Sequence, residues 1–166
     1  MAQVISIANQ KGGVGKTTTT INLGASIAIR GYKVLIIDTD PQGNATSGLG
    51  IEKSSVDQDV YNVLIDEISM SKTIHHTSTP DLDIVPATIQ LAGAEIELTS
   101  LMARETRLKQ GIDEISDQYD FILIDCPPSL GQLSINAFTA SDSILIPVQS
   151  EYYAMEGLSQ LLNTIR

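Results

Sequence analysis

The stretch NQKGGVGKTTTT, from Asn9 to Thr20, decides the fold. It follows a short apolar run, Val4–Ala8, and leads into a helical segment, Thr17–Arg30, that stops at Gly31. Glycines let backbone N–H groups converge on an anion without obstruction from Cβ atoms. The first turn of the following helix adds the positive end of its dipole. A strand, a glycine-rich turn and a helix in this order predict an anion-binding loop.

The loop matches a variant of the phosphate-binding motif. The usual pattern G-x-x-x-x-G-K-[ST] needs a glycine at position 10, where this chain has Gln10. The form K-G-G-x-x-K-T, the deviant P-loop, matches at every fixed position. The residues predicted to bind a nucleotide are Lys11, Gly12, Gly13, Val14, Gly15, Lys16, Thr17 and Thr18.

Three side chains of the loop have specific predicted roles with ATP and Mg²⁺. Lys16 reaches the β- and γ-phosphates as a point charge, and the Thr17 hydroxyl is a ligand for Mg²⁺. Thr18 is placed to bond the α-phosphate. β-Branched residues form helices poorly, but they are tolerable here because their hydroxyls have ligands or caps to serve.

Acidic residues end two of the predicted strands. Asp38 and Asp40 lie two apart in IIDTDPQGN, and Asp125 ends ILIDCPPS. Ligands gather at the carboxyl ends of parallel strands, so all three are expected beside the loop. Asp125 is predicted to hold Mg²⁺ through water, and Asp40 to orient or deprotonate the attacking water and to contribute to the metal site. Asp38 is predicted to support the metal shell; the alternative is that it only caps a neighbouring turn.

Two segments beside these carboxylates are expected to respond to the γ-phosphate. Gly43 and Asn44 form the first of these predicted switch loops, and the Pro127–Pro128 turn forms the second.

Apolar runs alternate with helical patterns along the whole chain. Expected strands cover Val4–Ala8, Val34–Ile37, Leu82–Val85, Phe121–Ile124 and Ser143–Val148. Expected helices cover Thr17–Arg30, Val60–Ile65, Leu91–Ala103, Arg104–Asp117, Leu133–Thr139 and Met155–Arg166. Residues 44–59 and 66–81 are expected to be loops or loosely held helices. The pattern predicts a three-layer α/β fold of the P-loop NTPase type, with a mostly parallel twisted sheet and helices on both faces.

Composition narrows the class of protein. A length of 166 residues with 42% apolar residues suits one domain, residues 1–166. The net charge of −10 argues against a nucleic-acid surface, since phosphate contacts need clustered cations. No apolar run approaches the ~20 residues that span a bilayer. The single cysteine fits a reducing compartment, and the expected location is the cytoplasm.

Three separated stretches resemble a known family. NQKGGVGKTTTTINLG, VLIIDTDPQGNATSGLG and YDFILIDCPPSLGQLSINAFTASDSILIPVQSEYYAMEGL look like the ParA/Soj partition ATPases, in the deviant Walker A class that includes MinD. The resemblance implies slow ATP hydrolysis by an ATP-dependent homodimer, in which Lys11 reaches the partner's phosphates. It also implies non-specific DNA binding on the nucleoid, a ParB-like centromere-binding partner, and chromosome or plasmid segregation.

The chain departs from the family in length. The final third of the family's sequence, with its last strands and most of its basic DNA-binding residues, is absent. The final predicted helix also lacks a stop signal, so the chain is expected to be a C-terminally truncated domain with weak affinity for DNA.

Other functions stay open. The first is a MinD-like regulator on a membrane, which needs a C-terminal amphipathic helix. The second is a capsule-type tyrosine kinase, which needs a C-terminal tyrosine cluster. The third is a nucleotide-binding remnant without turnover.

Several other residues are predicted to have structural or solvent-exposed positions and no role in catalysis. His75 and His76 are expected to be solvated, because no third metal ligand lies nearby in the sequence. Cys126 is expected to be a small buried residue and not a nucleophile. Tyr152 and Tyr153 are expected to pack or to lie on a dimer face. Solvated helix faces are expected to hold Glu95, Glu97 and Glu105.

Overall fold

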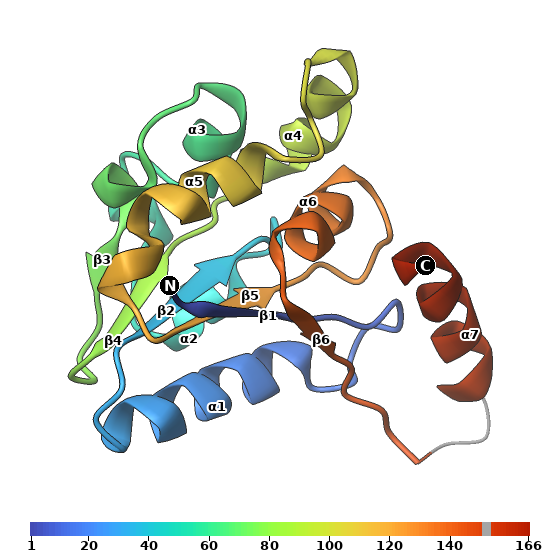
Figure 1. The fold of residues 1–166 in the computed structure, drawn as a ribbon, viewed down its shortest axis with the longest axis horizontal. Helices are drawn as coiled ribbons and strands as arrows, with labels where there is room; N and C mark the ends of the chain where they lie inside the picture. The colour runs from blue at the N-terminus through green and yellow to red at the C-terminus, as the bar shows by residue number, and fades with distance from the viewer. Residues whose placement is uncertain (151–153) are drawn as a thin grey trace.

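The computed structural model describes residues 1–150 and 154–166, and its centre is a six-stranded sheet (Figure 1). The strands are β1 (Gln3–Ile7), β2 (Val34–Asp38), β3 (His75–His76), β4 (Leu82–Val85), β5 (Phe121–Asp125) and β6 (Ser143–Leu145). Their order across the sheet is β3-β4-β2-β5-β1-β6. Every pairing is parallel except that of β3 with β4. The predicted mostly parallel sheet is confirmed.

Helices cover both faces of this sheet. One face carries α1 (Lys16–Ile29) and α2 (Asn44–Gly48). The other face carries α3 (Val60–Ile65), α4 (Leu91–Glu97), α5 (Arg107–Ile115) and α6 (Gln132–Ala140). In Figure 1, α7 (Ala154–Ile165) lies to one side, beyond β6. The three-layer α/β architecture predicted from the sequence is therefore confirmed.

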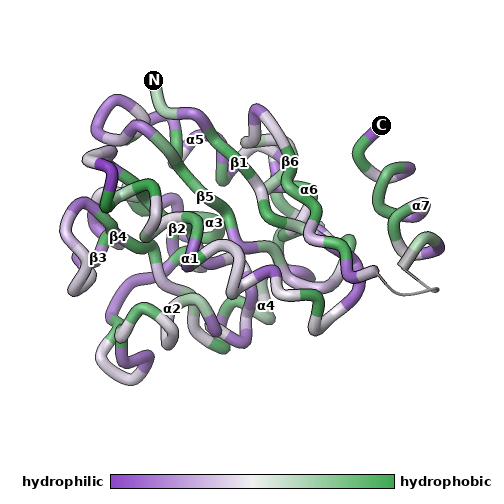
Figure 2. The backbone as a smooth tube through the Cα atoms, turned by 90° about the horizontal axis from the view of Figure 1, so that it is seen from below, coloured by the Kyte–Doolittle hydropathy of each residue, from purple (hydrophilic) through white to green (hydrophobic). Residues whose placement is uncertain are grey.

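Strand β2 shows how the sheet divides the core. All five of its residues are buried, because helices cover it on both sides. Val34 and Ile36 pack in the cluster beneath α1, whereas Leu35 and Ile37 pack in the larger cluster beneath α3–α6. This alternation is the period of two that extended backbone imposes. The central strands form the hydrophobic tracks seen in Figure 2.

The expected elements agree with the structure in most places. The bounds of β4 and α3 are those predicted, β2 and β5 each extend one residue further at the C-terminal end, and β1 is shifted by one residue toward the N-terminus. Strand β6 is shorter than predicted, because it ends at Leu145 instead of Val148. The helix predicted over Leu91–Ala103 ends early. After α4 a 3-10 turn covers Leu98–Ser100, and the prediction is wrong for residues 101–103, because Ala103 adopts a positive φ of 52° that no helix accommodates.

The two segments expected to be loops or loosely held helices contain short elements, of which the strand β3 was not predicted. Residues 44–59 hold α2 and a 3-10 turn (Lys53–Ser55), and residues 66–81 hold a second 3-10 turn (Met70–Thr73) and β3. Each has five residues or fewer, which is too short for a hydrophobic period to appear. Their backbone is held by tertiary contacts, so sequence periodicity gives no signal for them.

Among residues 1–150 and 154–166, no helix is both long enough and apolar enough to cross a membrane. The expected roles of Tyr152 and Tyr153 fall outside the described residues.

Cys126 offers a direct test of the core. The residue is 1% exposed, and burial raises the pKa of its thiol to about 12, so little reactive thiolate exists near neutral pH. We expect iodoacetamide to label the native protein at least about 100-fold more slowly than the urea-unfolded chain, because labelling requires the core around Cys126 to open. The urea midpoint from labelling should equal that from circular dichroism. Rapid stoichiometric labelling of native protein would contradict the buried position of Cys126.

Candidate functional site

The loop between β1 and α1 has the conformation that the glycines predict. Gly13 and Gly15 adopt φ values of 73° and 83°, in the region that residues with a Cβ avoid. Apart from the glycine and its chain neighbours, no atom of the described residues lies within 4 Å of a Cβ built at either position. The loop therefore presents open backbone, and helix α1 begins at Lys16 directly behind it. Backbone N–H groups and a helix start facing open space are the parts of an anion cradle.

Lys16 lies within this cradle and is only 7% exposed. Its Nζ donates a hydrogen bond to the backbone oxygen of Lys11, at 3.0 Å. Burial lowers the pKa of Lys16, while the negative charges of Asp125 and Asp40 oppose that shift. The amine is thus held over the loop by a neutral oxygen, and a phosphate oxygen would be a stronger acceptor for it.

Asp125 joins the end of β5 to the first turn of α1. Its Oδ2 accepts a hydrogen bond from Thr17 Oγ1 at 2.8 Å, and its Oδ1 accepts one from Thr20 Oγ1 at 3.1 Å. The residue is fully buried. Burial raises its pKa to about 6, although the two hydroxyls favour the charged form and lower it. The predicted neighbourhood of Thr17 and Asp125 is present in the structure.

Asp38 is also fully buried, and both its oxygens are occupied by the turn that follows β2. Oδ1 accepts the Asp40 N–H at 3.1 Å, and Oδ2 accepts the N–H and hydroxyl of Thr46, at 2.9 and 2.8 Å. Burial, followed by the charge of Asp125, raises the pKa of Asp38 to about 7. These contacts match the turn-capping alternative for Asp38 better than the metal-shell prediction.

Asp40 faces the open space in front of the loop. It is 9% exposed, and its Oδ1 accepts the backbone N–H of Gln42 at 2.9 Å. A cavity of about 440 Å³ opens here. Its lining residues are Gly12, Gly13, Gly15, Lys16, Thr17, Thr18, Asp40, Gln42, Asn44 and Pro128.

The cavity brings together most of the residues predicted to act. Lys11 is exposed and Val14 is buried, and neither lines the cavity. Asp125 lies behind Thr17 instead of on the cavity surface. Both predicted switch loops contribute a lining residue, Asn44 and Pro128, while Gln42 was not predicted. Its position two residues after Asp40 in the turn was the available signal.

The donor chemistry of the cavity suits a magnesium-bound triphosphate. Hydroxyl and carboxylate oxygens from Thr17, Asp40 and Asp125 are the hard ligands that Mg²⁺ prefers, directly or through water. Backbone amides and Lys16 face the same space and suit phosphate oxygens.

Glu95 was predicted to lie on a solvated helix face, and that prediction is wrong. Its carboxylate, on α4, accepts the backbone N–H groups of Gln132 and Leu133 at 2.7 and 3.3 Å, so it caps the start of α6. A Cβ built at Gly131 would overlap the Glu95 carboxylate, so a side chain at this position would displace the cap. Glu97 and Glu105 are exposed, as predicted.

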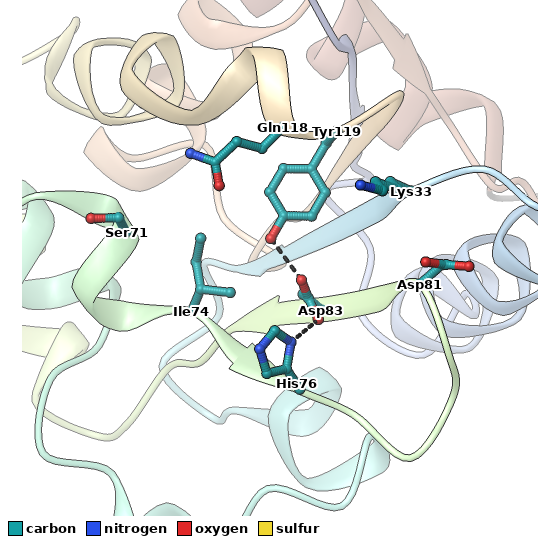
Figure 3. A pocket seen from close by; sticks show the side chains of 8 residues that line it. All are labelled: Lys33, Ser71, Ile74, His76, Asp81, Asp83, Gln118 and Tyr119. Atoms are coloured by element: carbon teal, nitrogen blue, oxygen red, sulfur yellow. Dashed lines mark hydrogen bonds and ion pairs between the residues drawn. The ribbon is translucent and has the colours of Figure 1, made fainter.

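A larger cavity, of about 580 Å³, lies at the opposite edge of the sheet (Figure 3). Its walls come from β3, β4 and the segments that precede β2, β3, β4 and β5, away from the glycine loop. Asp83 lies at its centre and accepts a hydrogen bond from Tyr119 Oη at 2.7 Å, and His76 Nδ1 lies 2.7 Å from the other carboxylate oxygen. Within the described residues, no group of three or more His, Cys, Asp or Glu is placed to hold a metal. The cavity with the loop, Lys16 and Asp40 is the candidate site because it carries the phosphate-binding geometry.

A three-layer α/β fold with this glycine loop defines a P-loop NTPase. Comparison with known proteins supports this class. The family model described as AAA domain matches residues 2–166. The chain belongs to this family.

Its relatives include the ParA and Soj proteins of chromosome partitioning, so the resemblance read from the sequence is confirmed. The sporulation initiation inhibitor protein Soj of Bacillus subtilis (strain 168) is 62% identical over 166 residues, which is 100% of this chain and 66% of Soj. The chromosome partitioning protein ParA of Myxococcus xanthus is 51% identical over 165 residues, 99% of this chain and 58% of ParA. The chain thus spans less than two thirds of the length of these curated relatives.

Solved structures are similar over nearly the whole chain. A crystal structure named cobyrinic acid a,c-diamide synthase, from Mycobacterium smegmatis with bound ATP analog and magnesium, has a TM-score of 0.95 and 39% identity. The match covers 99% of this chain and 67% of that one. A plasmid partition protein from Borrelia burgdorferi has a TM-score of 0.86 and 31% identity, covering 99% and 72% of the two chains.

The buried carboxyls generate a pH prediction for the nucleotide-free protein in a chelating buffer. The pKa values of Asp38 and Asp125 rise from 3.8 to about 7 and about 6, so the folded state binds their protons more tightly than the unfolded chain does. Their contribution to the free energy of unfolding is therefore greatest below pH 3.8 and is lost as pH rises toward 7.

We expect Asp38→Asn to flatten the fall in stability between pH 3.8 and pH 7, measured by urea denaturation at each pH, since it removes the larger of the two shifts. Asp113→Asn, at an exposed position on α5, is the matched control. Parallel curves for Asp38→Asn and the control would contradict the prediction.

Proposed function

We propose that this chain is the nucleotide-binding part of a Mg²⁺-dependent, ParA/Soj-type partition ATPase that converts ATP and water to ADP and phosphate. The observation that carries the proposal is the open glycine cradle with Lys16 above it and the Thr17–Asp125 pair behind it. The 62% identity to Soj supports the partition class, and the neighbour solved with an ATP analog and magnesium supports the ligands.

In the proposed complex, the triphosphate lies along the backbone amides of residues 12–18. Lys16 exchanges its bond to the Lys11 carbonyl for the β- and γ-phosphate oxygens, which are stronger acceptors. Thr18, which lines the cavity, donates to the α-phosphate. Each step uses groups that already face the cavity, so binding needs little rearrangement of the loop.

Mg²⁺ would be held by the Thr17 hydroxyl and, through water, by Asp125 and Asp40. When bound, it supplies charge neutralisation between the β- and γ-phosphates. Asp125 orients Thr17 because its Oδ2 accepts a hydrogen bond from Thr17 Oγ1 at 2.8 Å, which would leave the oxygen lone pairs of Thr17 available to the metal.

Asp40 is the proposed group that orients the attacking water and accepts its proton. The water oxygen forms a bond to the γ-phosphorus as the bond from that phosphorus to the bridging oxygen breaks. ADP leaves with the electron pair of that bond, and the released proton passes to Asp40. The Gln42 N–H and the turn around it hold Asp40 in place.

Lys11 is proposed to act across a homodimer. It is exposed beside the cavity, and a cation supplied by a second copy would stabilise charge that develops at the γ-phosphoryl group. A ParB-like partner and non-specific DNA on the nucleoid complete the proposed cycle. This chain carries a net charge of −10, so the DNA surface is proposed to lie outside it.

The proposal predicts that Lys16→Ala weakens ATP binding about 10- to 100-fold, because it removes a charge-assisted hydrogen bond to phosphate. Calorimetric titration with ATP and Mg²⁺ measures binding, and phosphate release measures turnover. If binding by the wild type matches that of Lys16→Ala, the cradle assignment is wrong. If only the hydrolysis rates of wild type and Lys16→Ala are equal, while wild type binds ATP more tightly, the chain is a nucleotide-binding module without turnover.

A second prediction concerns Lys11. We expect Lys11→Ala to lower the hydrolysis rate of the intact protein by about 1,000-fold, as loss of a trans-acting cation does in related chemistry. ATP affinity should stay within about threefold, because Lys11 does not line the cavity of its own chain. Lys109→Ala, an exposed lysine paired with Asp113 on α5, is the control. A normal rate for Lys11→Ala would exclude the trans role.

A further inference from the structure

We propose that Thr46 is a positioning residue for hydrolysis: its buried hydroxyl fixes the Asp40 turn by linking the ends of β2 and β4. This inference rests on the proposed function, since it assigns a role to the turn that carries the water-orienting carboxylate. Thr46 itself does not line the cavity, so it acts through other residues.

The hydroxyl of Thr46 connects two strands that are neighbours in the sheet. Thr46 lies in α2 and is fully buried. Its Oγ1 donates to Asp38 Oδ2 at 2.8 Å and accepts the backbone N–H of Ala87 at 2.9 Å. Asp38 ends β2, and Ala87 follows the end of β4. One oxygen thus serves as donor to one strand end and acceptor for the next.

Asp38 passes this restraint to Asp40. Its other oxygen accepts the Asp40 N–H at 3.1 Å. The Asp40 carbonyl in turn accepts the Gly43 N–H at 2.8 Å, which closes the turn on itself. The chain of contacts runs from Ala87 through Thr46 and Asp38 to the backbone of Asp40. A shift at Thr46 therefore displaces the carboxylate that faces the cavity.

Packing around the turn leaves little freedom to compensate. A Cβ built at Gly43 would lie 2.8 Å from the Ala87 backbone oxygen, so the turn already touches the β4 end. Ala87 is fully buried, so bulk solvent cannot replace a lost partner of its N–H. Removing the hydroxyl leaves that donor unsatisfied and removes one of the donors on Asp38 Oδ2. The turn must then move to recover hydrogen bonds, and Asp40 moves with it.

The test compares Thr46→Val with Thr46→Ser in the intact protein. Valine keeps the shape of threonine and loses both hydroxyl bonds, whereas serine keeps them. We expect Thr46→Val to lower kcat at least about tenfold, because a small displacement of an orienting group costs that much or more. ATP affinity should stay within about twofold, since the cradle contacts are intact. Thr46→Ser should restore kcat to within about threefold of wild type.

A matched control separates positioning from general loss of a buried hydroxyl. Thr73 is also fully buried, and its Oγ1 donates to the Met70 backbone oxygen at 2.8 Å, outside the candidate site. Thr73→Val should leave kcat unchanged. If Thr46→Val and Thr73→Val behave alike, or if Thr46→Ser fails to rescue, the positioning role is overturned.

Hydrogen exchange makes the result independent of activity. In nucleotide-free protein, Thr46→Val should speed exchange of the Asp40 and Gly43 amides about tenfold, while amides of α5 exchange as in wild type. If wild type and Lys16→Ala hydrolyse ATP equally, the proposed function fails, and exchange alone still decides whether Thr46 holds the turn. Unchanged exchange in folded Thr46→Val overturns the inference, and if Thr46→Val does not fold, the same comparison on Thr46→Ala decides it.

Discussion

The site depends on one interaction, the double hydrogen bond from Thr17 and Thr20 to the buried carboxylate of Asp125. It holds the first turn of α1 against the end of the central strand β5. The glycine loop between β1 and α1 therefore joins two elements whose relative position is fixed. Because the loop has few side chains, its conformation depends on the fixed positions of β1, β5 and α1. Anion-binding amides need this kind of external support, since glycine lowers steric barriers without selecting one conformation.

The same interaction concentrates ionisable groups at one end of an otherwise apolar sheet. Asp38, Asp125 and Lys16 are all buried there. Burial raises the pKa of both aspartates and lowers that of the lysine, so it favours the neutral form of each group. Such an arrangement is costly for folding and useful for binding, because a polyanion with its metal can satisfy groups that the protein alone satisfies incompletely. Stability and function therefore oppose each other at this end of the sheet.

The sequence predicted the frame better than the details. Long apolar runs and the loop motif placed β1, β2, β5 and α1, and the shared carboxyl edge of parallel strands placed Asp38 and Asp125 near one another. The sequence could not decide between the two roles considered for Asp38, because its partner Thr46 lies in a five-residue helix with no periodic signal. Glu95 was misjudged for a different reason: only the tertiary structure brings the start of α6 against it.

Strand register gives these carboxylates a geometric constraint of their own. Asp38 and Asp125 are direct partners on adjacent parallel strands, and Ile7 of β1 is the third member of that row. Side chains alternate faces along a strand, so inserting or deleting a single residue within β2 or β5 would send one carboxylate to the opposite layer. Apolar positions in these strands can exchange one aliphatic side chain for another, but the residue count up to each aspartate is fixed by the site. The lengths of β2 and β5 are thus constrained by the position of the carboxylates, and insertions or deletions must fall in the connecting segments.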